Sequence, residues 1–350
     1  MRKIRVLVVE DSLVFRKLLV RGLNMDPALE VVAEASDPFE ARDAIIKYNP
    51  DVMTLDVELP RMNGIEFLRK LMPQRPIPVV VISSLNNAVF DALQAGAVDF
   101  VNKPAVSDRT QLENFIMQEL AAKVKIASTA KIGRHKHLGA QQSLFKSGRF
   151  SPDTVIAIGA STGGTEAIYD VVKELDVDVP GIVIVQHMPP GFTEMYAKRL
   201  NNECRIEVKE AKTGDRVMPG RALLAPGDKQ MRLVKMNGGY QVECKDGPKV
   251  DGHRPSVTAL FDSVAQCAGK NAIGVILTGM GGDGAQGMLH MRQMGAQTIG
   301  QDEESCVVYG MPKVACDIGA VTYQLPLSEI PKKIYGLLSQ MQAGREGDSR

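Results

Sequence analysis

A serine in a glycine-rich turn is the most reactive arrangement in this sequence. Ser161 lies within Gly159-Ala-Ser-Thr-Gly163, which fits the pattern G-x-S-x-G of a nucleophile held between a strand and a helix. The apolar run Val155–Ile158 predicts a buried strand, and the residues from Glu166 onward have helical spacing. Taken alone, the turn fits equally well a phosphate-binding loop in which the serine is only a small hydrogen-bonding residue.

A histidine and an aspartate follow two further predicted strands. His187 comes after the apolar run 182–186, and Asp283 lies in a glycine-rich loop after the run 273–277. Parallel strands present their carboxyl ends at one edge, so these groups are expected to meet Ser161 there. The imidazole would take the serine proton and the carboxylate would fix its tautomer. His253, on a loop between Gly and Pro, is the alternative base.

Acidic, hydroxyl and basic residues follow four strands predicted in the first 120 residues. Five strands are expected in this part of the chain, near 4–9, 30–33, 52–55, 79–82 and 98–101, and all but the second are followed by such residues. The polar residues at their ends are Glu10, Asp11, Asp56, Ser83 and Lys103. Converging carboxylates repel one another unless a cation lies between them, and oxygen ligands of this kind suit Mg²⁺. A lysine and a hydroxyl beside them suit a phosphoryl group, whereas the alternative is a set of unrelated helix caps and loop charges.

The order of these elements predicts the fold class, which is α/β. Five β/α alternations in the first half predict a five-stranded parallel, flavodoxin-like sheet. A second series, with strands near 155–158, 182–186, 273–277, 297–300 and 321–324, predicts a doubly wound sheet. Residues 231–245 interrupt it as an antiparallel hairpin with a tight Asn-Gly turn. The expected division is a first domain over 1–122, a basic linker over 123–152, a second domain over 153–342 and a disordered tail over 343–350.

Composition narrows the range of partners. A net charge of +1 over 350 residues gives no global reason to expect binding to nucleic acid or to an anionic membrane. No apolar run approaches the roughly 20 residues of a membrane span, so an integral membrane protein is not expected. The five cysteines form no CxxC pair, which favours reduced thiols and a cytoplasmic location.

The first half resembles the receiver domains of two-component systems, on the residues at its strand ends. The resemblance implies that Asp56 accepts a phosphoryl group from a histidine kinase. The expected partner is the chemotaxis histidine kinase. It implies that Mg²⁺ is held by Glu10, Asp11, Asp56 and the carbonyl of Glu58. It also implies that Ser83 and Lys103 contact the phosphoryl oxygens and that Phe100 is the aromatic switch residue.

The whole chain resembles the chemotaxis response-regulator methylesterases. The resemblance rests on the motifs Ala160-Ser-Thr-Gly-Gly164, Gln186-His-Met188, His253-Arg-Pro-Ser256 and Thr278-Gly-Met-Gly-Gly-Asp-Gly284. It implies that Ser161 is the nucleophile, His187 the base and Asp283 its orienter, with no cofactor in the esterase. The implied substrates are glutamyl methyl esters of membrane chemoreceptors, and also receptor glutamines. The amides near Thr162 and Met280 are the geometric candidates for the oxyanion hole.

Two other outputs for the second half remain as alternatives. A DNA-binding module is common after a receiver, but about 200 residues of β/α alternation contain no short three-helix unit with a basic recognition helix. A nucleotide-binding output would use Gly159–Gly164 as a phosphate cradle. That stretch lacks G-x-x-x-x-G-K-[ST], and the spacing G-x-G-x-x-G fails because position 161 is serine.

Overall fold

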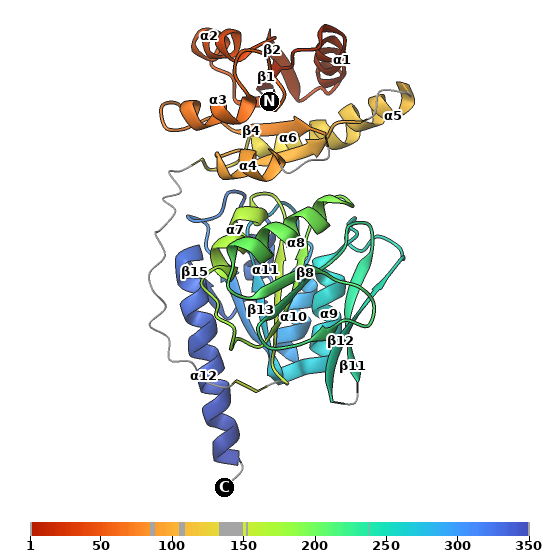
Figure 1. Ribbon diagram of the computed structural model, residues 1–350, viewed down its shortest axis with the longest axis vertical. Helices are drawn as coiled ribbons and strands as arrows, with labels where there is room; N and C mark the ends of the chain where they lie inside the picture. Colours follow the sequence, from red (N-terminus) through yellow and green to blue (C-terminus); the bar gives the residue numbers. More distant parts are fainter. Residues whose placement is uncertain are drawn as a thin grey trace. The chain divides into compact units, whose positions relative to one another are not determined.

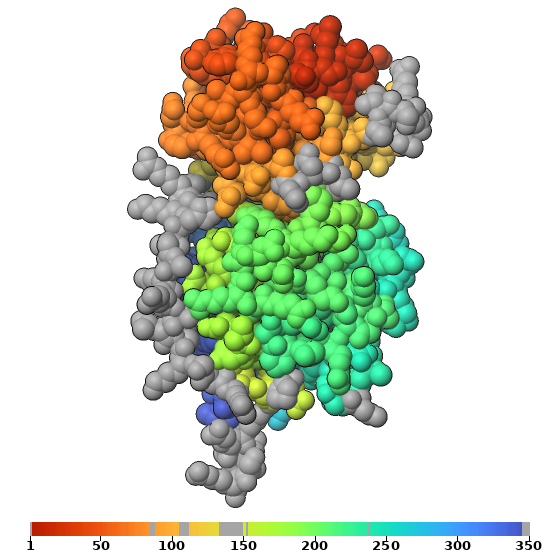
Figure 2. Space-filling model, viewed as in Figure 1, coloured from red at the N-terminus to blue at the C-terminus, as the bar shows by residue number. Residues whose placement is uncertain are grey.

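The chain divides into two units that each enclose their own sheet. The computed structural model describes residues 2–84, 88–104, 109–132, 150–151, 153–236 and 238–348. The units are Met1–Lys136 and His137–Arg350. In the space-filling view each unit forms a continuous packed body in its own range of colours (Figure 2). Most of the segment expected to link the domains, namely 133–149 and 152, lies outside the described residues.

The first unit is built on a parallel sheet with strand order β2-β1-β3-β4-β5 (Figure 1). Its strands are β1 (Ile4–Val9), β2 (Leu29–Ala35), β3 (Val52–Asp56), β4 (Val79–Ser83) and β5 (Asp99–Asn102). Every neighbouring pair is parallel, which confirms the predicted five-stranded sheet. The strand order reverses between β1 and β3, so a crevice for ligands is expected where these two strands end.

The helices of the first unit follow the predicted alternation. They are α1 (Leu13–Asn24), α2 (Pro38–Tyr48), α3 (Gly64–Leu71), α4 (Ala88–Gln94), α5 (Arg109–Asn114), the π-helical turn η1 (Phe115–Leu120) and α6 (Ala121–Ala127). Asp37 caps α2, since its Oδ1 accepts the amide of Phe39 at 2.8 Å. The helix continues past residue 122 because Val124 and Ala127 extend its buried face. Ser107, where the last helix was expected to begin, lies outside the described residues.

The second unit contains a seven-stranded parallel sheet with order β15-β14-β13-β6-β7-β10-β8. Its strands are β6 (Val155–Ala160), β7 (Gly181–Gln186), β8 (Glu207–Glu210), β10 (Arg221–Leu224), β13 (Ala272–Ile276), β14 (Gln297–Gln301) and β15 (Tyr323–Leu325). The predicted strands are present, but β8 and β10 were not predicted. The edge strand β8 reads Glu-Val-Lys-Glu, in which only Val208 is buried.

A small antiparallel sheet interrupts this series, as predicted. It consists of β9 (Arg216–Val217), β11 (Gln230–Met236) and β12 (Gly239–Lys245), with order β11-β12-β9. The register pairs Met236 with Gly239, so β11 and β12 form a hairpin. The tight turn expected at Asn237-Gly238 is described only at Gly238, which has a φ of 86°.

Helices complete the second unit. They are α7 (Gly164–Val172), α8 (Phe192–Glu203), α9 (Val257–Ala268), the 3₁₀ turn η2 (Gly269–Asn271), α10 (Ala285–Gln293), α11 (Met311–Asp317), the 3₁₀ turn η3 (Leu327–Glu329) and α12 (Ile330–Asp348). The disordered tail expected from 343 differs from the structure, in which α12 continues to Asp348. The helix continues through Gly344 and Gly347 even though glycine disfavours a helix, which is why the sequence did not predict this extension. None of the helices in the described ranges has both the length and the apolar character needed to cross a bilayer.

Both faces of the seven-stranded sheet are buried. Along β6, Val155 and Ala157 belong to a core cluster that includes Val257 of α9. The intervening Ile156 and Ile158 point to the opposite face, because side chains alternate along a strand, and they are buried too. The sheet therefore carries helices on both faces (Figure 1), which confirms the doubly wound arrangement. Because these strands are buried, the positions of their carboxyl ends are fixed, and the candidate site lies at those ends.

Candidate functional site

Ser161 lies in the turn between β6 and α7. Its amide donates to the carbonyl of Thr278 at 3.0 Å, and its carbonyl accepts the amide of Gly164 at 2.7 Å. The turn needs small residues. A Cβ added at Gly159 would lie 2.1 Å from a methyl group of Val257, and Gly163 has a φ of 75°. The backbone therefore holds the serine from both sides, independently of its hydroxyl.

The structure brings Ser161, His187 and Asp283 into one hydrogen-bonded chain. Ser161 Oγ lies 3.2 Å from His187 Nδ1, and His187 Nε2 lies 2.7 Å from Asp283 Oδ2. The three residues follow β6, β7 and β13, which are adjacent in the sheet order β13-β6-β7. The convergence at one edge follows from the parallel pairing of these strands.

The aspartate determines which nitrogen of His187 carries the proton. Asp283 is 2% exposed and ionised, so it can only accept a hydrogen bond from Nε2–H. Nδ1 of a neutral imidazole then has a free lone pair, and this atom faces Ser161 Oγ. The geometry is that of a general base poised to take the serine proton.

The first turn of α9 holds the triad carboxylate. Asp283 Oδ1 accepts from Ser256 Oγ at 2.8 Å and from the amide of Thr258 at 2.9 Å, while Oδ2 accepts the amide of Val257 at 2.7 Å. Burial raises the pKa of Asp283. The hydrogen bond and charge of His187, with the amides of Thr258 and Val257, lower it by more, so the pKa lies below its ordinary value. The carboxylate is therefore ionised at neutral pH.

Two residues of the site were not predicted from the sequence. Gln186 Nε2 donates to the carbonyl of Ser161 at 2.9 Å and to that of His187 at 3.2 Å, so it joins nucleophile and base. Ser256 caps α9 and also donates to Asp283. The sequence signal for Gln186 is a polar residue at the end of a buried strand. The signal for Ser256 is a serine immediately before a helix.

Within the described residues, the ring of His253 forms no hydrogen bond to Ser161. Its ring lies face to face with that of His187, with centroids 3.8 Å apart and planes 13° apart. The serine hydroxyl is instead bonded to His187. The structure therefore favours His187 over His253 as the base.

The backbone near Met280 passes directly against Ser161. A Cβ at Gly279 would lie 2.7 Å from Ser161 Cβ. The amide of Gly279 donates to Val308 at 3.0 Å, and its carbonyl accepts the amide of Met311 at 2.8 Å. Thr162, the other oxyanion candidate, is buried, and its carbonyl accepts from Thr278 Oγ1 at 3.0 Å. Both candidate amides thus belong to segments fixed beside Ser161.

The first unit gathers its acids where β1 and β3 end. Carboxylate oxygens of Glu10, Asp11 and Asp56 all lie within 4.8 Å of one another. Glu10 and Asp56 are buried, whereas Asp11 is exposed. The amide of Glu58 donates to Asp56 Oδ1 at 2.9 Å, which places the backbone of Glu58 against the cluster. Three hard oxygen ligands at this separation fit a divalent cation.

Lys103 completes this cluster from the end of β5. Its Nζ lies 2.6 Å from Asp56 Oδ2 and 2.9 Å from Glu10 Oε2. Burial raises the pKa of Glu10 to about 7, against the lowering effect of Lys103. Ser83 ends the neighbouring strand β4, and Phe100 is buried within β5. The acids and the lysine are thus in contact, with Ser83 at the adjacent strand end.

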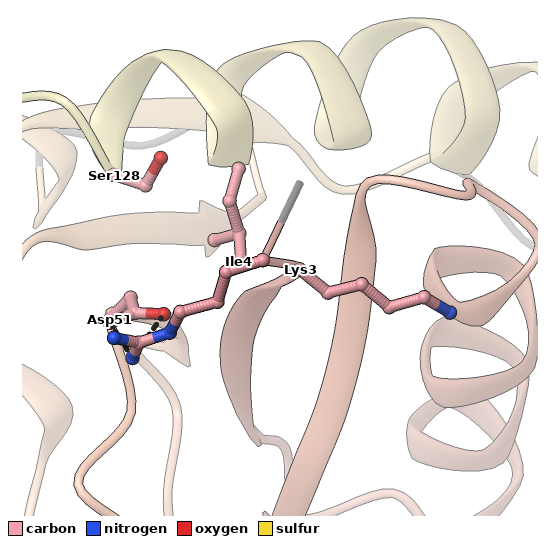
Figure 3. Close-up of a pocket in the computed structure, with 5 residues that line it drawn as sticks. Lys3, Ile4, Asp51 and Ser128 are labelled. Carbon is pink, nitrogen blue, oxygen red and sulfur yellow. Dashed lines mark hydrogen bonds and ion pairs between the residues drawn. The ribbon is translucent and has the colours of Figure 1, made fainter.

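A pocket at the opposite edge of the first sheet has different chemistry. Figure 3 shows it lined by Arg2, Lys3, Ile4, Asp51 and Ser128. Arg2 Nη2 and Asp51 Oδ1 form an ion pair at 3.1 Å. These residues lie at the amino ends of β1 and β3, away from the acid cluster at the carboxyl ends, and we assign them no part in it.

Known families match both units. The CheB methylesterase family matches residues 156–334, and the response regulator receiver domain matches residues 6–116. A protein-glutamate methylesterase/protein-glutamine glutaminase of Syntrophomonas wolfei is 59% identical over 97% of this chain and 99% of its own length. One of Salmonella typhimurium is 50% identical over 99% of this chain and 100% of its own length.

A solved structure supports the same assignment for the second unit. The catalytic domain of the Thermotoga maritima CheB methylesterase is 39% identical, with a TM-score of 0.52, and covers 53% of this chain and 98% of its own. A DNA-binding or nucleotide-binding output is therefore excluded as the identity of this unit. With both domains in the same order and relatives matching over nearly their full lengths, this chain belongs to the CheB family of response-regulator methylesterases.

Proposed function

We propose that this protein hydrolyses glutamate methyl esters of methyl-accepting chemotaxis receptors and deamidates glutamines there, with Ser161, His187 and Asp283 as its catalytic residues. The observation that carries the proposal is the hydrogen-bonded chain from Ser161 Oγ through His187 to Asp283. The full-length relatives, which are named for both activities, identify the substrate class.

The first half of the reaction forms an acyl-enzyme. Ser161 Oγ attacks the ester carbonyl while its proton passes to His187 Nδ1, and the amides of Thr162 and Met280 bind the resulting oxyanion. The imidazolium formed on His187 is stabilised by Asp283. The C–O bond to the methoxy group then breaks, and His187 returns the proton to that oxygen, releasing methanol.

Water completes the cycle by the same route. His187 takes a proton from the water that attacks the acyl carbonyl, and returns it to Ser161 Oγ as the acyl bond breaks. The product is a glutamate side chain. A glutamine substrate follows the same steps with ammonia as leaving group, and the proton from His187 Nδ1 matters more because an amide ion does not leave unprotonated.

Methanol release tests the proposed activity. Full-length protein is incubated with membranes that carry methylated chemoreceptors, with and without a small-molecule phosphodonor. The expected result is methanol release that increases with the phosphodonor. Membranes whose receptors were never methylated provide the control. No release from methylated membranes, with protein that still folds and reacts with a fluorophosphonate, would refute the proposed substrate.

The acid cluster is proposed to bind Mg²⁺ and to make Asp56 the phosphorylation site. Glu10, Asp11, Asp56 and the Glu58 carbonyl would hold the ion, which would neutralise charge on the transferred phosphoryl group. Ser83 and Lys103 would contact the phosphoryl oxygens, and Phe100 would respond to them. The phosphodonor in the cell would be the chemotaxis histidine kinase. The proposed location is the cytoplasm, and five free cysteines are consistent with a reducing compartment.

Replacing Asp56 by asparagine should abolish labelling by a radioactive phosphodonor. The amide nitrogen cannot accept a phosphoryl group, and Lys103 loses a charged partner 2.6 Å away. Chelation of Mg²⁺ should have the same effect on the wild type. Asp51→Asn, at the opposite edge of the same sheet, is the matched control and should label normally. Labelling of Asp56→Asn at the wild-type level, or full labelling of the wild type in chelator, would contradict the assignment.

We also propose that the receiver restrains the esterase until Asp56 is phosphorylated. Each unit has its own sheet and site, so a signal at Asp56 must act through the influence of one unit on the other. Phosphorylation adds nearly two negative charges beside Lys103. A coupling typical of allosteric proteins corresponds to roughly 5- to 150-fold activation.

Removing residues 1–145 should therefore raise basal methanol release by a factor in that range. The remaining fragment should no longer respond to the phosphodonor, since it lacks Asp56. The isolated catalytic domain of the Thermotoga maritima relative has a crystal structure, so a fragment of this extent is expected to fold. A fragment no faster than the unphosphorylated full chain would exclude inhibition by the receiver.

A further inference from the structure

His253 covers one face of the catalytic base. The two imidazole rings are nearly parallel, and their centroids are only 3.8 Å apart. The hydrogen bonds of His187 run through Nδ1 and Nε2, in the plane of its ring. Two such bonds fix the ring along the line between Ser161 and Asp283, but they do not prevent it from tilting about that line. The His253 ring, stacked on the face of His187, does prevent this tilting.

A tight turn places His253 against the base. Val250 and His253 exchange both backbone hydrogen bonds, at 3.1 and 2.9 Å. The residues between them, Asp251 and Gly252, have φ values of 50° and 81°, as a type I′ turn requires. Gln230 Nε2 donates to the carbonyl of His253 at 3.0 Å, which anchors the turn to β11. The backbone of His253 is thus held by hydrogen bonds, while its ring packs against His187.

The same segment also holds the triad carboxylate. Ser256, Val257 and Thr258 donate to Asp283. Thr258 Oγ1 donates in turn to Asp251 Oδ2 at 2.6 Å, which ties the start of α9 to the turn. Residues 250–258 therefore contact the base on its face and its partner carboxylate at both oxygens, so the ring and the carboxylate are positioned by one piece of chain.

The charge state of His253 suits a packing role. Burial lowers the pKa of His253, and the neighbouring His187 lowers it further, to about 4. The ring is therefore neutral near pH 7. In the described part of the chain its nitrogens form no hydrogen bond to Ser161 or Asp283, so it is not placed to exchange a proton with either. A neutral, flat ring can also remain stacked when His187 becomes an imidazolium during the reaction.

We propose that His253 is a positioning residue for the esterase reaction, whose stacked ring fixes the plane of His187 so that Nδ1 stays aligned with Ser161 Oγ and then with the leaving group. This inference rests on the proposed function of the triad. Removing the stack leaves the three catalytic groups in place but lets the His187 ring tilt. Small errors in the alignment of a catalytic group lower the reaction rate strongly.

Two substitutions at His253 separate packing from chemistry. His253→Ala removes the ring, whereas His253→Phe keeps a flat ring that cannot carry a proton. His290→Ala is the matched control, because His290 belongs to a partly exposed pair with Asp262 elsewhere in the same unit. Each full-length variant is assayed for methanol release from methylated receptor membranes and for the rate of fluorophosphonate labelling of Ser161. Thermal unfolding monitors folding.

The expected result is a loss in His253→Ala of about 10- to 100-fold in kcat with little change in KM, and a similar loss in labelling rate. His253→Phe should retain most of the wild-type kcat, and His290→Ala should match the wild type. Wild-type activity in His253→Ala would overturn the proposal. So would a folded His253→Phe as slow as His253→Ala, since a ring nitrogen would then be required.

The labelling assay separates this inference from the proposed function. If the wild type reacted with the fluorophosphonate but released no methanol, the receptor substrate would be wrong, while the effect of the stack on Ser161 would still be measured. If the wild type released methanol and all three variants kept wild-type rates, the inference about His253 alone would fail.

Discussion

Replacing Ser161 by alanine should lower kcat for methanol release on the order of 10⁶-fold, and His187→Ala should cost about as much. In the proposed mechanism the serine oxygen forms the covalent bond and the imidazole removes its proton, so either loss would stop the same step. The double variant should be little slower than either single one, because the residues act as a unit. The activity that remains reflects substrate binding and the oxyanion amides.

The fold should survive these changes. The turn at Ser161 is held by the backbone bonds to Thr278 and Gly164, which the alanine variant keeps. Thermal unfolding and receptor binding are the controls, together with loss of fluorophosphonate labelling. A Ser161→Ala protein that retained most of its activity would refute the nucleophile. An active His187→Ala beside an inactive His253→Ala would transfer the role of base to His253.

Replacing Asp283 by asparagine should reduce kcat on the order of 10⁴-fold. Four donors converge on this side chain, from His187, Ser256, Val257 and Thr258. An asparagine has one acceptor oxygen and a donor NH₂ group. If the NH₂ group faces His187, it donates to Nε2, which moves the ring proton to Nδ1 and removes the lone pair that Ser161 needs.

The other orientation of the asparagine is no better for the fold. Its NH₂ group then faces the amide of Thr258, so a buried donor meets a donor, and Ser256 Oγ loses the acceptor for its proton. Each unsatisfied buried group costs about 1–3 kcal/mol of stability. The variant should therefore be both slower and less stable.

Asp262→Asn supplies the matched control for this prediction. Asp262 also pairs with a histidine, His290, at 3.1 Å, but both side chains are more than a third exposed. Its replacement should change neither the rate nor the unfolding temperature appreciably, because exposed pairs contribute little. An Asp283→Asn protein as active as Asp262→Asn would show that the carboxylate does not orient the base.

The positions of the chemical groups were largely predictable because they follow strands. Asp56 and Lys103 in the first unit, and Ser161, His187 and Asp283 in the second, each come directly or within a few residues after an apolar run. Parallel strands end at the same edge, so residues distant in sequence meet there. Hydrophobic pattern therefore predicted the first sheet, five of the seven strands of the second sheet, and which residues would gather at the carboxyl edges.

Contacts made through loops were not predictable in the same way. The stacking of His253 depends on a turn folding back onto β11 through Gln230, which no periodicity encodes. The strand β8 was not predicted because three of its four residues are charged, and β10 was not predicted because its apolar part, Ala222–Leu224, is only three residues long. The helical extension to Asp348 contains Gly344 and Gly347, so neither residue propensity nor an apolar stripe predicted it.

The anchoring of Asp283 on α9 has a consequence for the product. Hydrolysis ends with a new glutamate anion beside Ser161, and the tetrahedral intermediate before it is also negative. A bare buried carboxylate nearby would repel both. The positive end of the α9 dipole and the amides of Val257 and Thr258 offset much of the charge on Asp283. The site can therefore generate the anionic product near Asp283, because the negative charge of Asp283 is already offset by the amino end of α9.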